Sequence, residues 1–194
     1  TVEKGAVRAY IREDGTQLTG TYRGNGTPED PYLANSITDL QVIDKNASTR
    51  AEHYRLSADI DASATNDSTW NDGDGFEPIA GASGETFNGS LDGAGHTISD
   101  LSVDRTGENS TGLVASLDRS GVLEGLTLRN TSVTGSDNVG LVVGTSNGMV
   151  RNVTASGTVT GADRVGGLVG TAESGSVVTE SSVAVTTSGI RQVG

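Results

Sequence analysis

Gly112-Leu113-Val114-Ala115 returns along the chain as Gly140-Leu141-Val142-Val143-Gly144 and again as Gly167-Leu168-Val169-Gly170. The three leucines are spaced 28 and 27 residues apart, and a Gly-containing turn and a run with apolar positions follow each copy. A period in the twenties built from short β-prone runs is typical of a solenoid, in which each repeat covers the open edge of its neighbour. The pattern therefore favours a scaffold or binding rod over a compact enzyme.

Short β-prone runs separated by Gly turns continue from Phe76 to the C-terminus, with about three runs in each repeat. They include Phe76–Ile79 and Gly112–Ala115. Three short strands in such a coil predict a triangular cross-section and hence a parallel β-helix, in which each strand bonds to its equivalent in the next coil. We therefore predict an all-β fold, with coils over residues 76–194. A propeller is excluded, because each blade needs about 40 residues.

Residues 23–60 are expected to cap this solenoid. Ser36 and Asp39 fit a capping box at a helix start. The apolar residues that follow fall on one helical face; they are Ile37, Leu40 and Ile43. The sequence thus predicts a short amphipathic helix over 36–46 that plugs one end of the solenoid and shields the strand edge of the first coil.

Residues 1–22 lie outside the repeat pattern. Val7–Ile11 and Gln17–Tyr22 predict a strand pair. This segment is interpreted either as an N-terminal strand pair of this unit or as the tail of a preceding domain.

The composition fits a solenoid adapted to high salt. The chain has 28 Gly among 194 residues and only 33% hydrophobic residues, as a thin aliphatic core with tight corners requires. Its net charge is −12, and Arg outnumbers Lys by 11 to 2, which predicts a halophilic archaeon as the source. The charge argues against nucleic-acid partners, and no apolar run predicts membrane insertion. With no Cys, the chain has neither disulfides nor a thiolate site.

Seven Asn-x-Ser/Thr triplets predict an extracellular, cell-surface glycoprotein. Seven of the eleven Asn residues belong to such triplets, against two or three expected by chance, and the acceptor pattern marks surface loops in secreted chains. The bland alternative is that Asn and Thr are common turn residues. The predicted glycosylation sites are Asn25, Asn46, Asn66, Asn88, Asn109, Asn130 and Asn152.

The Gly-Leu-Val copies resemble the GLUG motif, and the flanks resemble the segments that accompany it. The most specific flank is Phe76-Glu77-Pro78-Ile79 followed by residues 87–98, and the resemblance covers roughly 23–194. It implies a right-handed parallel β-helix on a secreted or surface-attached protein. In that family the repeats occur in adhesins and as accessory modules beside proteases such as IgA-cleaving metallopeptidases. Ala115 departs from the pattern, because a Gly closes the later copies.

One loop offers candidate ligands for a hard cation. Residues 61–75 carry alternating side-chain oxygens, the donors that Ca²⁺ prefers, although the EF-hand spacing is not met. A solvated acidic loop is the simpler interpretation. No cofactor is predicted to be required, and Ca²⁺ is the one candidate. The predicted metal ligands are Asp67, Asn71, Asp72 and Asp74.

A carbohydrate-active β-helix enzyme of the polysaccharide lyase or hydrolase type is the leading alternative. Asp59 and Asp61 alternate on one strand face, as the paired carboxylates of a glycosidase do. Asp92 and Asp100 could add further acids, with Arg105 nearby. The two histidines, His53 and His96, do not form a His-Glu-x-x-His zinc motif, so a zinc protease site is absent.

A Ca²⁺-stabilised carbohydrate-binding module is the second alternative. Trp70 and four tyrosines lie in the first 70 residues and could form a face that binds surface glycans. The main prediction remains a non-catalytic rigid rod in a surface layer, filament or adhesin. Val193-Gly194 stands where another Gly-Leu-Val copy would begin, so the C-terminal coil edge is expected to contact a second copy or a neighbouring domain of a longer chain.

Overall fold

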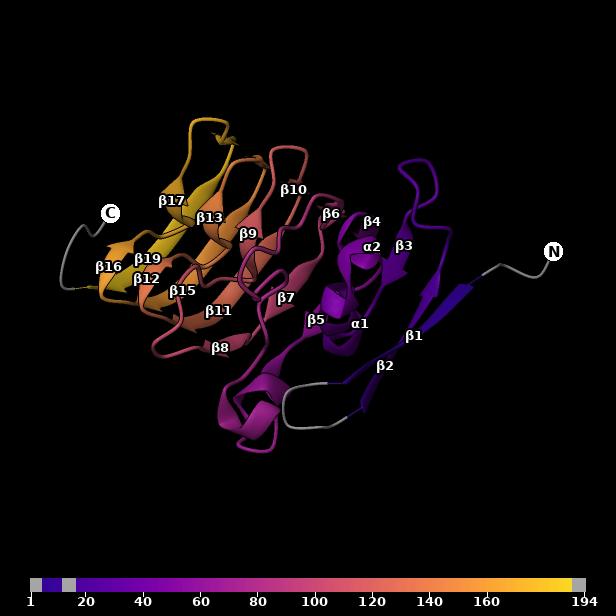
Figure 1. Ribbon diagram of the computed structural model, residues 1–194, viewed down its shortest axis with the longest axis horizontal. Coiled ribbons are helices and arrows are strands. Elements are labelled where there is room, and N and C mark those ends of the chain that lie inside the picture. Colours follow the sequence, from indigo (N-terminus) through magenta and orange to yellow (C-terminus); the bar gives the residue numbers. More distant parts are fainter. Residues whose placement is uncertain (1–4, 12–16, 190–194) are drawn as a thin grey trace.

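A computed structural model describes residues 5–11 and 17–189 of the chain. It is an all-β solenoid of roughly four turns, whose coils stack from the N-terminal end to the C-terminal end (Figure 1). The predicted parallel β-helix is therefore confirmed. The predicted contact at Val193-Gly194 lies outside the described residues. No helix in the described part of the chain has the length and apolarity needed to cross a membrane.

The first sheet runs along the length of the solenoid and has eight strands. From β3 onward its strands are parallel, and β2 joins β3 in antiparallel fashion. In spatial order, the strands are β1 (Gly5–Ile11), β2 (Gln17–Arg23), β3 (Tyr32–Ala34), β4 (His53–Leu56), β6 (Ser90–Asp92), β10 (Val122–Glu124), β14 (Met149–Arg151) and β18 (Val177–Thr179). The predicted N-terminal strand pair is thus present, and it extends this sheet.

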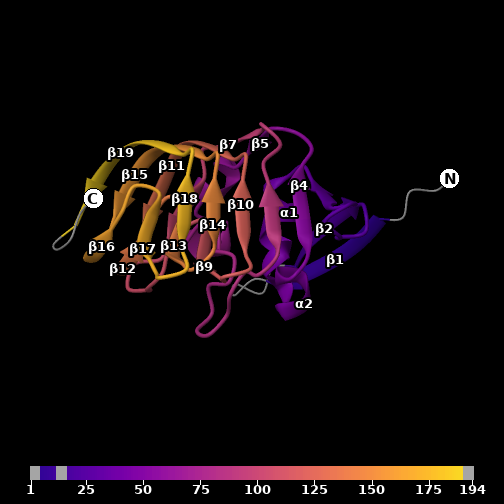
Figure 2. The same ribbon diagram turned by 90° about the horizontal axis from the view of Figure 1, so that it is seen from above.

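Three further parallel sheets complete the coils, seen in Figure 2 beside the first. The second contains β5 (Ile60–Asp61), β7 (Thr97–Ser99), β8 (Ser102–Asp104), β11 (Thr127–Thr134), β15 (Thr154–Thr160) and β19 (Ser182–Ser188). The third contains β9 (Val114–Leu117), β13 (Val143–Ser146) and β17 (Val169–Ala172). The fourth is the pair β12 (Asp137–Val139) and β16 (Asp163–Val165).

Aliphatic side chains at equivalent positions fill the interior as ladders. In the first sheet, register pairing aligns Leu91, Leu123 and Val150, and each is fully buried. In the second sheet it aligns Ile98, Leu128 and Ala155 in the same way. Since each coil buries only a few small residues, the low apolar content suffices for the core.

The Gly-Leu-Val copies form a corner and the start of a strand. Leu113 and Leu141 are fully buried, and the third-sheet strands begin at Val114, Val143 and Val169. The predicted strands of this motif therefore begin two or three residues too early. The other predicted strand, Phe76–Ile79, is reduced to a bridge between Ile79 and Val114. The strand is short because Pro78 has no backbone N–H to donate to a neighbouring strand. Ala80, two residues later, has a left-handed φ of 61°.

Ala115 replaces the Gly of the later motif copies because its surroundings differ from those of the equivalent residues. Register places Ala115, Gly144 and Gly170 at one position of successive coils. A Cβ on Gly144 would lie 2.3 Å from the carbonyl carbon of Ser110 in the preceding coil, so only Gly fits. Ala115 instead lines a cavity of about 650 Å³ between residues 80–86 and 105–110, where a methyl group is accommodated.

The predicted cap helix is present as α1 (Ile37–Val42), which continues into the 3₁₀ helix η1 (Ile43–Lys45). A helix that the sequence did not predict, α2 (Ala47–Arg50), follows it. Ser36 accepts the N–H of Asp39, as a capping box requires. The Asp39 carboxylate, however, accepts the N–H groups of Thr21 and Asn35, so it ties the β1–β2 hairpin to the cap. Two 3₁₀ turns, η2 (Ser63–Asn66) and η3 (Asn71–Gly73), lie in the next loop.

Candidate functional site

The cap meets the solenoid through two buried polar side chains. The Gln41 amide donates to the Glu77 carbonyl and accepts the Glu77 N–H, both at 3.0 Å. The Asp44 carboxylate accepts the Ala80 N–H at 2.7 Å. Residues 77–80 form the N-terminal edge of the third sheet, where Ile79 pairs with Val114. These side chains therefore occupy the place of a neighbouring strand and close that edge.

A buried cation neutralises Asp44 and links it to the next loop. Arg50 donates from Nη1 to Asp44 Oδ1 at 3.1 Å and from Nη2 to Glu85 Oε1 at 2.6 Å. Burial nevertheless raises the pKa of Asp44 to about 7, with the Ala80 hydrogen bond and Arg50 opposing that effect. We refer to Gln41, Asp44 and Arg50 as the cap latch. Sequence analysis missed it, because its partners lie about 35 residues away along the chain.

The solenoid interior is partly exposed to solvent at the last coil that the structure describes. Val178 aligns with Val150 in the first sheet, yet Val178 is 43% exposed and Val150 is 0% exposed. Val183 aligns with the fully buried Ala155 in the second sheet and is 43% exposed. These valines point inward in the register of the core ladders, so the apolar interior continues to the face of the last described coil.

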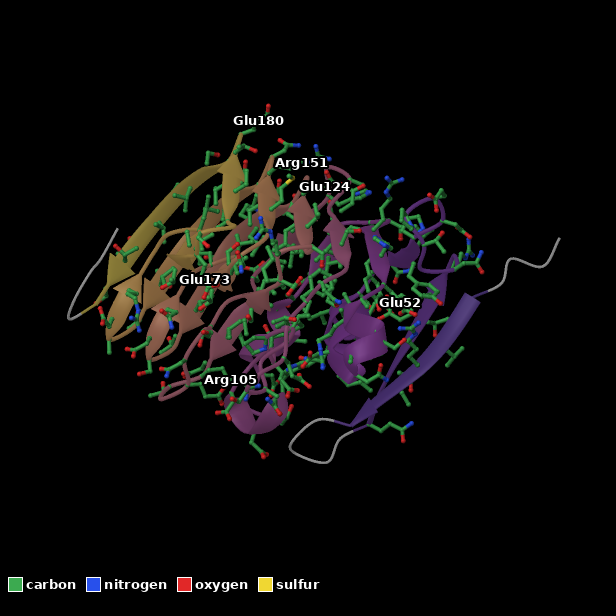
Figure 3. The ribbon with its side chains drawn as sticks, turned by 45° about the horizontal axis from the view of Figure 1, so that its top comes forward. Glu52, Arg105, Glu124, Arg151, Glu173 and Glu180 are labelled. Atoms are coloured by element: carbon green, nitrogen blue, oxygen red, sulfur yellow. The ribbon has the colours of Figure 1, made fainter. Side chains whose placement is uncertain are left out.

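A charged rim follows one corner of the first sheet. Arg55 pairs with Asp92 at 2.9 Å, and Arg151 donates to Glu124 at 2.6 Å from Nε. Figure 3 shows Glu124 and Arg151 on this rim, with Glu180 beyond them. Both arginine side chains are about half exposed, and exposed pairs contribute roughly 0–1 kcal/mol each. The rim is therefore a solvated surface feature.

Three of the four tyrosines lie in the core, and the side chain of Tyr10 is outside the described part of the chain. Tyr22, Tyr32 and Tyr54 are buried and pack with ring centroids 5.4–5.9 Å apart. Arg8 lies over the Tyr32 ring, 4.6 Å from its centroid. Trp70 packs against the core and is only partly buried. The sequence-based aromatic patch is thus mainly part of the core beneath the hairpin.

The residues predicted to bind Ca²⁺ are not gathered into one cluster. Over residues 5–11 and 17–189, no three acidic, His or Cys side chains lie where they could share a metal ion. Asp67 accepts the N–H and hydroxyl of Thr69 instead, and Asp74 lies 4.0 Å from Arg105. Asn71 is buried, and its Nδ2 atom has no hydrogen-bond partner. Asp72 is exposed and adopts a left-handed φ of 56°.

The acids of the alternative enzymatic site are engaged with the backbone. Asp59 accepts the Thr97 N–H and contacts His96, and these hydrogen bonds lower the pKa of Asp59. Hydrogen bonding with Ser63 lowers the pKa of Asp61. Both carboxyl groups are therefore ionised at neutral pH, whereas a glycosidase acid needs a raised pKa. His53 contacts the Ser90 hydroxyl rather than an acid.

The other residues of the alternative enzymatic site are Asp92, Asp100 and Arg105, and each has its own partner. Asp92 pairs with Arg55, Asp100 holds the Asn130 side chain, and Arg105 is buried beside Glu108 and Asp74. The three side chains thus have separate structural partners.

All seven predicted glycosylation sites are exposed in the structure. Two of them, Asn130 and Asn152, occupy corners with left-handed φ values of 54° and 50°. Asn tolerates this conformation better than most residues, so a turn preference accounts for part of the Asn content. Exposure of every acceptor is compatible with both interpretations of the triplets.

The fold and these surfaces define a parallel β-solenoid with aliphatic core ladders, an N-terminal cap held by the cap latch and an exposed apolar face at the last described coil. Over 185 residues, 95% of the chain, the sequence is 65% identical to a segment of Halomucin from Haloquadratum walsbyi; this segment is 2% of that protein. Over 134 residues it is 31% identical to a protein of Evansella cellulosilytica described as a Gly-rich membrane protein, and the match covers 68% of the chain and 15% of that protein. No protein-family profile matches the chain.

The fold is also similar to a solved structure. A crystallised chain from Bacteroides ovatus, described as an immunoglobulin A1 protease, superposes with a TM-score of 0.63 at 19% identity. The match covers 84% of the present chain and 50% of that chain. At this identity the likeness concerns the fold alone.

Proposed function

We propose that the chain is a non-catalytic, extracellular rod segment of a cell-surface protein of a halophile. Its likeness to a segment of Halomucin and to a Gly-rich membrane protein supports a surface or structural role. The acidic, Lys-poor composition supports adaptation to concentrated salt. We further propose that the three Gly-Leu-Val copies are GLUG repeats, since they build the corners of a solenoid as that resemblance implies.

The observation that carries the rod proposal is the exposure of inward-facing residues at the last coil. Val178 and Val183 are each 43% exposed although they continue fully buried ladders. A further coil in the same parallel register would cover both and pair the open backbone edges of β18 and β19. We therefore propose that the next coil of a longer solenoid covers this face, and a second copy of the chain is the competing occupant.

Surface exposure on intact cells tests this function directly. Brief protease treatment of the source cells, kept in concentrated salt, should release peptides of this chain while a cytoplasmic marker protein stays inside. Release only after lysis would contradict the extracellular role. Incubation of the purified chain with polysaccharides should produce no new reducing or unsaturated ends, and their appearance would favour the carbohydrate-active alternative.

A further inference from the structure

We propose that the folded solenoid accepts N-linked glycans at Asn25, Asn46 and Asn66, and that the other four acceptors can be modified only before their coils form. This inference rests on the proposed extracellular function, because the Asn-x-Ser/Thr pattern has meaning only for a chain that meets the glycosylation machinery. Exposure of the asparagines cannot separate the two groups, since all seven are exposed. The separation comes from the backbone and from the hydroxyl residue of each triplet.

The first three triplets lie outside the sheets, and most of the hydrogen bonds that hold them are local. The N–H groups of Asn25, Gly26 and Thr27 all donate to the carbonyl of Asp30, within the β2–β3 turn. The second triplet caps α2, where Asn46 accepts the N–H of Ser48. One bond is longer in range: the Gly26 carbonyl accepts the N–H of His53 in β4. The other bonds join residues at most five apart, so the Asn and hydroxyl residues of both triplets can be drawn out without separating two paired strands.

The third triplet combines a local turn with one distant side-chain contact. The N–H of Asp67 donates to Ala64 within the loop. Asn66 donates from Nδ2 to the Asp100 carbonyl at 2.9 Å. Ser68 is exposed, as are the hydroxyl residues of the first two triplets, Thr27 and Ser48.

Two of the later triplets have a central or hydroxyl residue inside the core. Thr111 is 1% exposed, and its N–H donates to Asn138 in the next coil. Thr131, the middle residue of the triplet at Asn130, is also 1% exposed and lies within β11 between two neighbouring strands. An enzyme that reads the hydroxyl two residues after Asn has no access to Thr111 in the folded chain.

The other two later triplets are pinned between coils by their backbones. Asn88 and Gly89 both donate to the carbonyl of Arg50, and Ser90 begins β6. Asn152 donates to the carbonyl of Thr179, and Thr154 donates to that of Leu126, on opposite neighbouring coils. Presenting either triplet to an enzyme requires opening the sheet, which occurs far less often than local loop opening.

The transfer chemistry fits the loop sites as they stand. A lipid-diphosphate-linked oligosaccharide is the donor: a bond forms between Asn Nδ2 and the anomeric carbon, and the anomeric C–O bond to the diphosphate breaks. Lipid diphosphate leaves, and one Nδ2 proton is released. The amide keeps one N–H, so a modified Asn66 can still donate to Asp100 and a modified Asn25 to Asp30.

The test compares the folded chain with seven unstructured peptides, each carrying one triplet and its flanks. Both are incubated in salt with a purified oligosaccharyltransferase and a lipid-linked oligosaccharide, and occupancy at each Asn is measured by mass spectrometry. The rate ratio of folded chain to peptide should be near one at Asn25, Asn46 and Asn66. It should be at least ~10-fold lower at the other four sites, a ratio that corresponds to about 1.4 kcal/mol of opening free energy.

Equal ratios at all seven sites would overturn the inference, and so would protection of the three loop sites. Gly144→Ala supplies an internal control, since its Cβ would press on Ser110 within the triplet at Asn109. It should raise modification at Asn109 and leave Asn25 unchanged; a rise at both sites, or at neither, would contradict the partition. Because the assay uses purified protein, a failure of the extracellular assignment leaves its result unaffected.

Discussion

Val150 and Val178 occupy the same position in successive coils, but only Val150 is covered on both sides. Val150 pairs with Leu123 and Val178 in its two neighbouring strands and is 0% exposed, whereas Val178 is 43% exposed. The difference in exposure between the two valines shows how much burial a further coil provides.

The two valines should therefore respond differently to truncation. Val150→Ala removes buried methyl groups and leaves a cavity, so the free energy of unfolding should fall by about 2 kcal/mol. Val178→Ala at the open face should cost less than ~1 kcal/mol. Urea unfolding in concentrated KCl measures both, and equal losses would argue that the last coil is covered in the isolated chain.

Gln41 should be more important for stability than an exposed Gln of the same chain. Gln41→Leu keeps the volume but leaves the Glu77 N–H and C=O groups without partners, at a cost of roughly 1–3 kcal/mol for each. The exposed Gln17 in β2 is the matched control, and Gln17→Leu should change stability by no more than ~0.5 kcal/mol. Similar effects of the two substitutions would contradict the role of Gln41 in closing the sheet edge.

Asp44 should make stability fall as the pH rises. Its folded pKa of about 7 lies above the unfolded value of 3.8, so the folded state binds more protons between these values. That contribution is complete below the unfolded pKa and is lost as the pH passes through the folded pKa. Relative to Asp44→Asn, the unfolding free energy should drop from about pH 4 to about pH 7, by at most about 4 kcal/mol.

The charged groups around Asp44 are the same in the wild-type chain and in the Asp44→Asn variant. Arg50, Glu85 and Glu77 face Asp44, and their titration largely cancels in the difference between wild type and variant. Parallel pH profiles for the two proteins would contradict the raised pKa of Asp44.

Gly144→Ala and Ala115→Gly should have unequal costs in stability, although the two residues are equivalent in register. Gly144→Ala places a Cβ 2.3 Å from the Ser110 carbonyl carbon, so a backbone segment must shift at a cost of ~1–3 kcal/mol. Ala115→Gly affects a residue that lines a cavity and should cost no more than about 1 kcal/mol. Thermal unfolding of the two variants checks the order, and a larger loss for Ala115→Gly would refute this explanation of the motif.

The repeat was predictable from the sequence because equivalent residues recur along the chain. The regular spacing of Leu113 and Leu141 along the sequence predicts a buried ladder. Ser36 predicts a helix start because its side chain caps a nearby backbone N–H. The cap latch was not predictable, because Gln41 finds its partner on a segment 36 residues away with no periodic signal. For the same reason Asp39, placed in a local capping box, also serves Thr21 in the hairpin.

The central claim is that this chain is part of a longer solenoid, and adding one coil tests it most directly. Residues 141–167, one full repeat, are duplicated after Gly194, which keeps the phase of the repeat. A scrambled version of the same residues is the control. If a further coil covers Val178 and Val183, the unfolding free energy in concentrated KCl should rise by at least ~2 kcal/mol over the scrambled control. An unchanged or lower value would contradict the claim.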